Sequence, residues 1–258
     1  MQGFFEFIAW RMEPPTPYGT FHILYVIIGF AVCALFAWLL RGIGDKSAER
    51  MLFSLGFILA VSELIKQGFY YFMITDRSYH WYEFPFQMCS IPMYLCLLLP
   101  LVKIKWLKRS MYAVMALYNF PGGAIAFSEP SGMFHGYWFL TLHSISWHMI
   151  LVFIGLFILF SRRAGARRSD YVYATAWFIF LSAVAFLINY LVQTRIGAEI
   201  NMFFVGPGKS PIIVFEQFCE WFGWQVNTLI YLFVACLGVY GLSNIVYIIN
   251  RKTSLKRK

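Results

Sequence analysis

Two histidines, His143 and His148, stand five residues apart in an otherwise apolar stretch, Gly136–Ser161. Histidine exchanges protons near neutral pH, so it often serves as a general acid or base. Two serines, Ser144 and Ser146, add hydroxyl groups beside them. On a helix these four side chains cover an arc of roughly 200°. Polar groups facing lipid would lack partners, so we expect other helices to surround this segment and to enclose a polar site.

A cysteine offers a nucleophile at a matching depth. Cys89 lies about five residues into the apolar stretch Phe84–Val102 and His143 about seven residues into its own, so their depths agree within about 3 Å. We expect His143 to deprotonate either Cys89 or a water molecule for nucleophilic attack. Backbone donors near Pro92 or Gly122–Gly123 are candidates to hold the oxyanion. This pattern is typical of nucleophilic or general-base catalysis.

Two ionisable residues, Glu63 and Lys66, lie near the middle of the stretch Met51–Ile74. Ionisable groups at this depth are costly and normally face a bundle interior or water. At positions i and i+3 they can pair with each other, or Lys66 can extend outward along its aliphatic stem. Glu63 also matches His148 in depth, so it is a candidate to orient that imidazole. Both interpretations stay open.

Amide side chains at similar depths complete a candidate site. Because the stretches alternate in direction, polar residues in their middle or outer halves are expected to line one cavity in the outer half of the bilayer, capped by the loop Thr194–Gly223. The candidate catalytic residues are Cys89, His143 and His148, and the candidate substrate-binding residues are Glu63, Lys66, Gln87, Asn119 and Asn189.

Composition identifies the class of protein that holds these residues. The chain is 60% hydrophobic and only 13% charged, unlike soluble proteins. Apolar runs long enough to span a bilayer, which takes about 20 residues, recur along it. We predict an all-α polytopic membrane protein, a seven-helix bundle forming one domain over residues 1–258. The predicted spans are Tyr18–Leu40, Met51–Ile74, Phe84–Val102, Ser110–Phe127, Gly136–Ser161, Tyr171–Val192 and Trp224–Ile249.

The distribution of charge predicts the orientation. Most lysines and arginines fall in the connections after the first, third and fifth stretches and in the C-terminal tail. Since cytoplasmic loops are enriched in these residues, the N-terminus is predicted outside and the C-terminus inside. The net charge of +9 is explained by this asymmetry and by attraction to anionic lipid. It therefore predicts membrane lipids, and no nucleic acid, as partners.

The cysteines suggest neither a metal nor a disulfide framework. Their spacing includes no CxxC pair and no metal-binding pattern. We therefore predict no metal and no cofactor. The five cysteines are Cys33, Cys89, Cys96, Cys219 and Cys236.

Several short motifs together resemble a known family. They are Pro85–Ile91 (PFQMCSI), Asn119–Gly123 (NFPGG), the pair His143 and His148, and the region Asn189–Pro207 with its NMFF sequence. In this order they resemble the bacterial YwaF-type integral membrane proteins. Those proteins are distantly related to a eukaryotic transmembrane acyltransferase that remodels ether phospholipids and, more distantly, to the androgen-induced membrane hydrolases of fatty-acid esters. The resemblance implies a multi-pass protein of the bacterial cytoplasmic membrane with lipid acyl chemistry.

One position departs from the pattern of that family. The residue two after Pro85 is typically histidine, followed by cysteine two residues later, whereas this chain has Gln87 and then Cys89. Glutamine keeps hydrogen-bonding capacity but cannot transfer a proton near neutral pH. The eukaryotic acyltransferase uses a cysteine and a histidine, and its cysteine aligns either with Cys89 or nearer Phe86. If the residue at position 87 acts as an acid or a base in relatives, this chain has lost that function or carries it out with another residue.

Three functions remain open. The first is an enzyme for lipid acyl transfer or ester hydrolysis. The second is a protein that binds or transports a lipid or a small hydrophobic solute, and the third is a structural or accessory membrane protein whose polar groups hold helices together. Each leaves room for a homo-oligomer or another membrane partner. A nucleophile needs its base within reach, whereas transport needs a path to the inner side.

Overall fold

The computed structural model describes residues 2–208 and 213–255. These residues form helices joined by short connections, and among them the only β-type pairing is one antiparallel bridge between Arg11 and Tyr137. The predicted all-α class is confirmed. The α-helices of the described residues are α1 (Gln2–Ile8), α2 (Thr20–Leu40), α3 (Asp45–Phe69), α4 (Ile91–Leu98), α5 (Lys105–Val114), α6 (Phe120–Ile125), α7 (Trp138–Phe160), α8 (Ser169–Leu191) and α9 (Ile213–Leu255).

Four of the described helical segments are long and apolar enough to cross a membrane. They correspond to the first, fifth, sixth and seventh predicted stretches, which indicates a multi-pass membrane protein. The total of seven crossings stays a prediction. The four segments are Thr20–Leu40, Trp138–Phe160, Ser169–Ile196 and Phe215–Thr253.

The third predicted stretch is only partly helical. Helix α4 begins at Ile91 instead of at Pro85, and its eight residues span about 12 Å. Pro92 occupies the first turn of α4, where a missing N–H breaks no helical bond. Ahead of α4 lie an irregular segment and a short 3₁₀ turn, Met88–Ser90. The expectation of a helix from Phe84 onward was therefore wrong for the first half of this stretch.

The fourth stretch is a helix interrupted by a π turn. Helix α5 continues through the π turn Met115–Asn119 into α6, which contains Pro121. Gly123 lies so close to α7 that a Cβ atom there would come within 2.9 Å of the Leu151 Cβ. Its lack of a side chain therefore permits close packing of this helix against α7.

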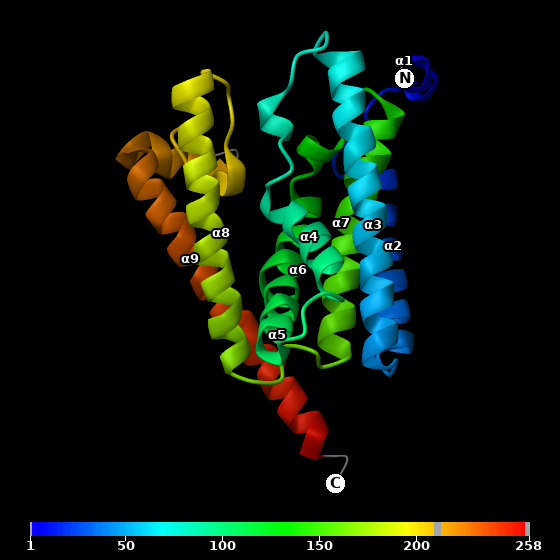
Figure 1. Ribbon diagram of the computed structural model, residues 1–258, viewed down its shortest axis with the longest axis vertical. Coiled ribbons are helices and arrows are strands. Elements are labelled where there is room, and N and C mark those ends of the chain that lie inside the picture. Colours follow the sequence, from blue (N-terminus) through cyan, green and yellow to red (C-terminus); the bar gives the residue numbers. More distant parts are fainter. Residues whose placement is uncertain (1, 209–212, 256–258) are drawn as a thin grey trace.

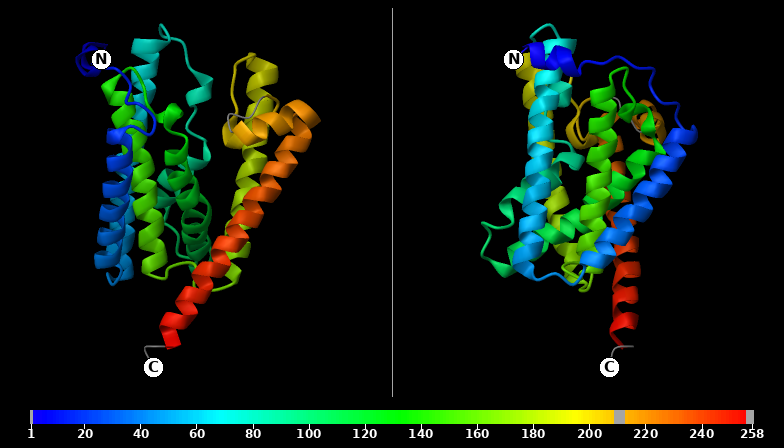
Figure 2. Two further views of the ribbon diagram at one scale, coloured as in Figure 1. Left: turned by 180° about the vertical axis from the view of Figure 1, so that it is seen from behind. Right: turned by 90° about the vertical axis from the view of Figure 1, so that its right-hand side faces the viewer.

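Helix α9 contains a sharp break. Gly223 has φ 78° and ψ 164°, which is not helical. The segment Ile213–Phe222 therefore runs at an angle to the long remainder of α9 (Figures 1 and 2). The long portion begins close to Trp224, where the seventh span was predicted to start.

The helices pack around α7. This helix contacts α2, α3 and α6, while α5 packs against α8. The N-terminus, the connection after α3 and the start of α7 lie at one end of the molecule, and the C-terminal end of α9 lies at the other (Figure 1). We call the first of these the N-terminal end. Helices α2 and α3 diverge toward it (Figure 2, right).

The opposite end holds several of the basic residues that were predicted to face the inside. Arg109 makes two hydrogen bonds to the buried carboxylate of Asp170, at 2.6 and 2.7 Å. Lys108 Nζ lies 2.6 Å from Glu49 Oε1. The ion pair of Arg109 and Asp170 connects α5 to α8. Removing either partner would leave a buried charge uncompensated.

Candidate functional site

A cavity of about 160 Å³ lies between α3, the segment leading into α4, and the first half of α7. Its lining residues on α3 and α7 belong to the parts of these helices that lie toward the N-terminal end (Figure 1). Three elements distant in sequence therefore supply its polar groups. The lining residues are Glu63, Lys66, Tyr70, Tyr82, Glu83, Phe84, Gln87, Cys89, Ser90, Gly132, His135, Leu140, His143, Ser144, Trp147 and His148.

Six of the eight candidate residues line this cavity, and two do not. Cys89, His143, His148, Glu63, Lys66 and Gln87 are among the lining residues, whereas Asn119 and Asn189 are not. The glycines Gly122 and Gly123, considered as oxyanion donors, are not among them either. Sequence reasoning missed Glu83, His135 and Trp147. An acid and a histidine directly beside predicted spans were the available signals for the first two.

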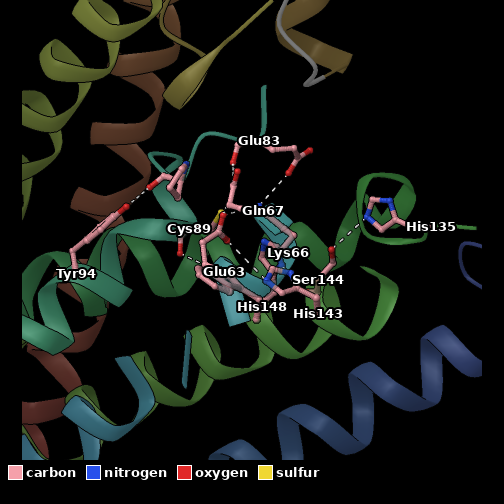
Figure 3. A network of polar contacts seen from close by, with 12 residues as sticks. Glu63, Lys66, Gln67, Glu83, Cys89, Tyr94, His135, His143, Ser144 and His148 are labelled. Carbon is pink, nitrogen blue, oxygen red and sulfur yellow. Dashed lines mark hydrogen bonds and ion pairs between the residues drawn. The ribbon is translucent and has the colours of Figure 1, made fainter. Parts of the chain in front are cut away.

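An ion-pair network crosses the cavity (Figure 3). Lys66 Nζ lies 3.1 Å from Glu63 Oε1 and 3.1 Å from Glu83 Oε2. Gln67 donates hydrogen bonds to Glu63 Oε1 at 2.7 Å and to the Glu83 carbonyl at 2.5 Å. Glu63 is 4% exposed, and such a buried carboxylate is stable only when paired. The pairing of Glu63 with Lys66 expected from their spacing is present.

His143, and not His148, lies beside Glu63. Its Nε2 atom is 3.9 Å from Glu63 Oε2, and this buried nitrogen has no hydrogen-bond partner among the described residues. His148 instead makes a hydrogen bond through Nδ1 with the Ser144 carbonyl, at 2.8 Å. Five residues rotate a helix position by about 140°, so both rings cannot face the same carboxylate. The expectation that Glu63 orients His148 was wrong.

The backbone around Cys89 is held by two side chains. Asn119 Nδ2 donates to the Met88 carbonyl at 2.7 Å, and Trp147 Nε1 donates to the Cys89 carbonyl at 2.9 Å. Pro92, four residues after Met88, has no N–H to offer that carbonyl. Asn119 therefore fixes the segment that carries Cys89 and does not face the cavity.

Gln87 and Asn189 bind the backbone of the segment 200–207. The Gln87 side chain accepts from the Phe203 N–H at 3.0 Å and donates to the Asn201 carbonyl at 3.2 Å. Asn189 donates to the carbonyls of Met202 and Val205 at 3.0 and 3.1 Å, and it accepts from the Met202 N–H at 2.7 Å.

The segment held in this way is strained. Phe203 and Phe204 have φ of 55° and 56°, a left-handed conformation that residues with a Cβ rarely adopt. Gln193 adds hydrogen bonds to the carbonyls of Ile200 and Pro207. Such strain persists only where surrounding contacts enforce it. The amide side chains of Gln87, Asn189 and Gln193 therefore stabilise the backbone of this segment, at the depth where contacts with a substrate were expected.

The loop Thr194–Gly223 does not line the cavity within its described part, and its residues 209–212 lie outside the described residues. The cavity is instead bounded by Tyr82 and Glu83 before α4 and by Gly132 and His135 before α7. The predicted cap is therefore displaced: its segment 200–207 is hydrogen-bonded to Gln87, which is one of the lining residues.

His135 adds a titratable group at the edge of the site. Its Nε2 atom lies 3.4 Å from the Ser144 hydroxyl. Burial lowers the pKa of His135 from its ordinary value, and Lys66 acts in the same direction, while Glu83 opposes them. The imidazole is therefore neutral at pH 7 and can act as a hydrogen-bond donor or acceptor toward a ligand.

The site contains the groups that nucleophilic attack assisted by proton transfer requires. A thiol, an imidazole with an unpartnered nitrogen and a carboxylate next to that imidazole share one cavity. No group of three metal-ligating side chains comes together in the described part of the chain. The chemistry that these residues can support is nucleophilic or general-base attack.

Long apolar helices around a buried polar cavity define a multi-pass integral membrane protein with an enclosed polar site. The chain belongs to the TMEM164 family, whose family model matches residues 17–240. No curated protein and no solved structure matches the chain significantly. Membership confirms a transmembrane protein that contacts membrane lipids, while the resemblance to YwaF-type proteins stays an interpretation.

Proposed function

We propose that this protein is a membrane enzyme that transfers or hydrolyses a lipid acyl group, with Cys89 as nucleophile and His143 as general base. The observation that carries the proposal is that Cys89 and His143 line one cavity while the Glu63 carboxylate lies 3.9 Å from His143 Nε2. A neutral imidazole with a free nitrogen accepts a proton, and a neighbouring carboxylate stabilises the imidazolium that results.

In the first step His143 takes the proton of the Cys89 thiol, and the thiolate attacks the carbonyl carbon of a lipid ester. The tetrahedral intermediate collapses by breaking the bond to the alkoxide leaving group, which takes the proton from His143. The products are a thioester on Cys89 and a lysolipid alcohol. This sequence divides one difficult acyl transfer into two easier steps.

In the second step an acceptor hydroxyl gives its proton to His143 and attacks the thioester. Collapse of the intermediate expels the Cys89 thiolate, which recovers the proton from His143. A lysolipid acceptor completes acyl transfer, and water completes hydrolysis. The alternative in which water attacks the ester directly needs His143 and not Cys89.

The other lining residues are assigned supporting roles. Lys66 is held between two carboxylates, so it fixes Glu63 and Glu83 more than it offers a free cation. His148 contributes to the wall, since its Nδ1 is used within α7. A cavity of about 160 Å³ is smaller than typical ligand pockets of about 300 Å³ and more. We infer that only the ester end of a lipid enters it.

The test is turnover of a phospholipid labelled in its acyl chain, in vesicles containing the purified protein. His143→Ala is expected to abolish transfer and hydrolysis. Cys89→Ser is expected to lower the rate by at least about 100-fold if the thiol is the nucleophile, since a hydroxyl is much harder to ionise. Cys219→Ser, which is outside the cavity, serves as the matched control.

The outcomes separate the candidate functions. A hydroxylamine-sensitive acyl adduct on Cys89 supports the two-step route, and a severe His143→Ala defect with a silent Cys89→Ser supports attack by water. Equal turnover in wild type and His143→Ala would reject the enzyme. In that case lipid retained or moved across the membrane would favour binding or transport, and the absence of both would favour an accessory role.

The proposed setting is the cell membrane of a bacterium, with seven crossings and the N-terminus outside. The alternation of the helices between the two ends (Figure 1) and the basic residues gathered at the C-terminal end support this topology. A tag after Lys258 should be protected from a membrane-impermeant reagent in intact cells, whereas a cysteine at Ser78 should be labelled. A labelled C-terminal tag would reverse the orientation or change the number of crossings.

A further inference from the structure

A second cavity, of about 370 Å³, lies outside the polar site, between α2, α3 and α7. On α7 it uses Ser146, Met149, Ile150 and Phe153, whereas the polar cavity uses residues 140, 143, 144, 147 and 148. At about 100° per residue these two sets are centred roughly 140° apart. The second cavity is therefore independent of the proposed acyl chemistry. Its remaining lining residues are Tyr25, Val32, Cys33, Phe36, Leu40 and Leu55.

Helix α2 packs closely against α7 at Gly29 and Cys33, and the cavity lies beside this contact, on the side that includes Leu55 of α3. Gly29 lies against the Met149 side chain, where any side chain at position 29 would collide with it. One turn further on, the Cys33 thiol donates to the Met149 carbonyl at 3.5 Å. Helices α2 and α3 diverge toward the N-terminal end (Figure 2), and α3 contributes Leu55 to the lining of the cavity.

The cavity opens onto the outer surface of these helices. Val32 and Phe36 line it and are 45% and 51% exposed. Both α2 and α7 have the length and composition of membrane-crossing helices. The surroundings are therefore hydrocarbon, and water has few polar partners in a space lined almost entirely by apolar side chains.

The length of the cavity fits a hydrocarbon chain. From Tyr25 to Leu40 the lined face of α2 runs about 22 Å. One leaflet of the hydrocarbon core is about 15 Å thick. An acyl chain from one leaflet can therefore lie fully along this face.

One end of the cavity is polar. Tyr25 and Ser146 line it, and both carry a hydroxyl group. Tyr25 stands five residues into α2, about 7 Å from the start of this helix, so it is nearer the N-terminal end of the molecule than the rest of the α2 lining. These hydroxyls can therefore bind an ester carbonyl while the rest of the cavity binds the chain.

We propose that this cavity is a binding groove for one acyl chain of a membrane phospholipid, with the ester carbonyl at Tyr25 and Ser146 and the chain along α2 toward Leu40. The bound chain completes the packing that α2 lacks on its α3 side. It is distinct from the general lipid surface, because it occupies a concave space with a fixed polar end.

The test uses the full-length protein in nanodiscs that contain a trace of phosphatidylcholine with a diazirine in the middle of one acyl chain. After irradiation, adducts are mapped by mass spectrometry. We expect them to concentrate on Val32, Phe36, Leu55 and Ile150 by at least about five-fold over equally exposed residues of α8 and α9. Adducts spread evenly over all exposed apolar residues would overturn the proposal.

A matched pair of variants on α3 checks the site itself. Leu55→Trp fills the groove and should remove the concentrated adducts, whereas Leu64→Trp should not, since Leu64 is 72% exposed and lines neither cavity. If Leu55→Trp does not fold, Ser146→Ala gives the second reading, with reduced retention of phospholipid in native mass spectrometry. Unchanged labelling in the folded groove variants, or labelling by a photoreactive free fatty acid alone, rejects a phospholipid groove.

Discussion

The side-chain amide of Asn119 donates a 2.7 Å hydrogen bond to the carbonyl of Met88, the residue next to Cys89. The same carbonyl accepts the Ile91 N–H at the end of the 3₁₀ turn. Because position 92 is proline, no helical N–H competes for the remaining lone pair. The π-turn end of one helix thus fixes the irregular backbone of another, and the position of the candidate nucleophile depends on it.

Asn119→Ala is expected to destabilise the protein by about 1–2 kcal/mol, because a buried carbonyl loses a partner. It should also raise the rate at which Cys89 reacts with a small alkylating reagent, since the segment becomes more mobile. Thermal unfolding and mass-spectrometric mapping measure the two effects. The control is Asn244→Ala, which removes an exposed bond to the Tyr240 carbonyl. Equal alkylation in wild type and Asn119→Ala would show that the bond does not position Cys89.

Glu63→Ala is expected to destabilise by about 3 kcal/mol, because it removes one partner from a buried ion pair. Lys66 keeps Glu83, which limits the loss. Adding Lys66→Met to Glu63→Ala should not recover stability, since it leaves the Glu83 carboxylate without its ion-pair partner. The comparison is made by denaturant or thermal unfolding in one detergent. If Glu63→Ala melts like the wild type, then water or lipid headgroups solvate this carboxylate.

Asn189→Ala removes three hydrogen bonds to the backbone of residues 202–205, at about 1 kcal/mol each. It should also release the left-handed conformation of Phe203 and Phe204. Hydrogen exchange of the amides in this segment should become faster by at least about ten-fold, while α2 remains unchanged. Thr194→Ala serves as the comparison, since its hydroxyl bonds only within its own helical turn. Unaltered exchange in Asn189→Ala would mean that packing alone enforces the conformation.

Stability should fall as the pH drops below about 6.5, and His135 should contribute to the fall. Burial holds its folded-state pKa below the unfolded value of about 6.5, so below that pH the unfolded state binds more protons. The effect is absent above that pH. Replacing the imidazole in His135→Gln should flatten the dependence between pH 7 and 5, measured as the difference in unfolding free energy from wild type. Identical pH profiles would exclude His135 as a contributor.

Four of the predicted spans, and the common cavity of Cys89 and His143, could be predicted because they depend on local properties. Hydrophobic length located α2, α7, α8 and the long part of α9, and residue counts along each stretch brought Cys89 and His143 to the same level. Depth fixes one coordinate only. Rotation about the helix decides which side chains meet, and it placed His143, not His148, next to Glu63.

What could not be predicted depends on tertiary pairing. Asn119 and Asn189 were expected in the cavity because polar side chains inside a membrane need partners, and that requirement was correct. Their partners are backbone carbonyls freed by proline or by left-handed residues, not a ligand. Glu83 enters the site from a connection whose path no periodicity describes.

The break at Gly223 sets how the end of the chain matches the bilayer. Without it, the 43 residues of α9 would form a rod of about 65 Å, more than twice the hydrocarbon thickness of about 30 Å. A single glycine, in a conformation that other residues avoid, lets the first turns lie apart from the rest and shortens the rod that crosses. It defines the level at which the protein leaves the hydrocarbon, so a bulkier residue at position 223 would change the tilt that the bilayer imposes on α9.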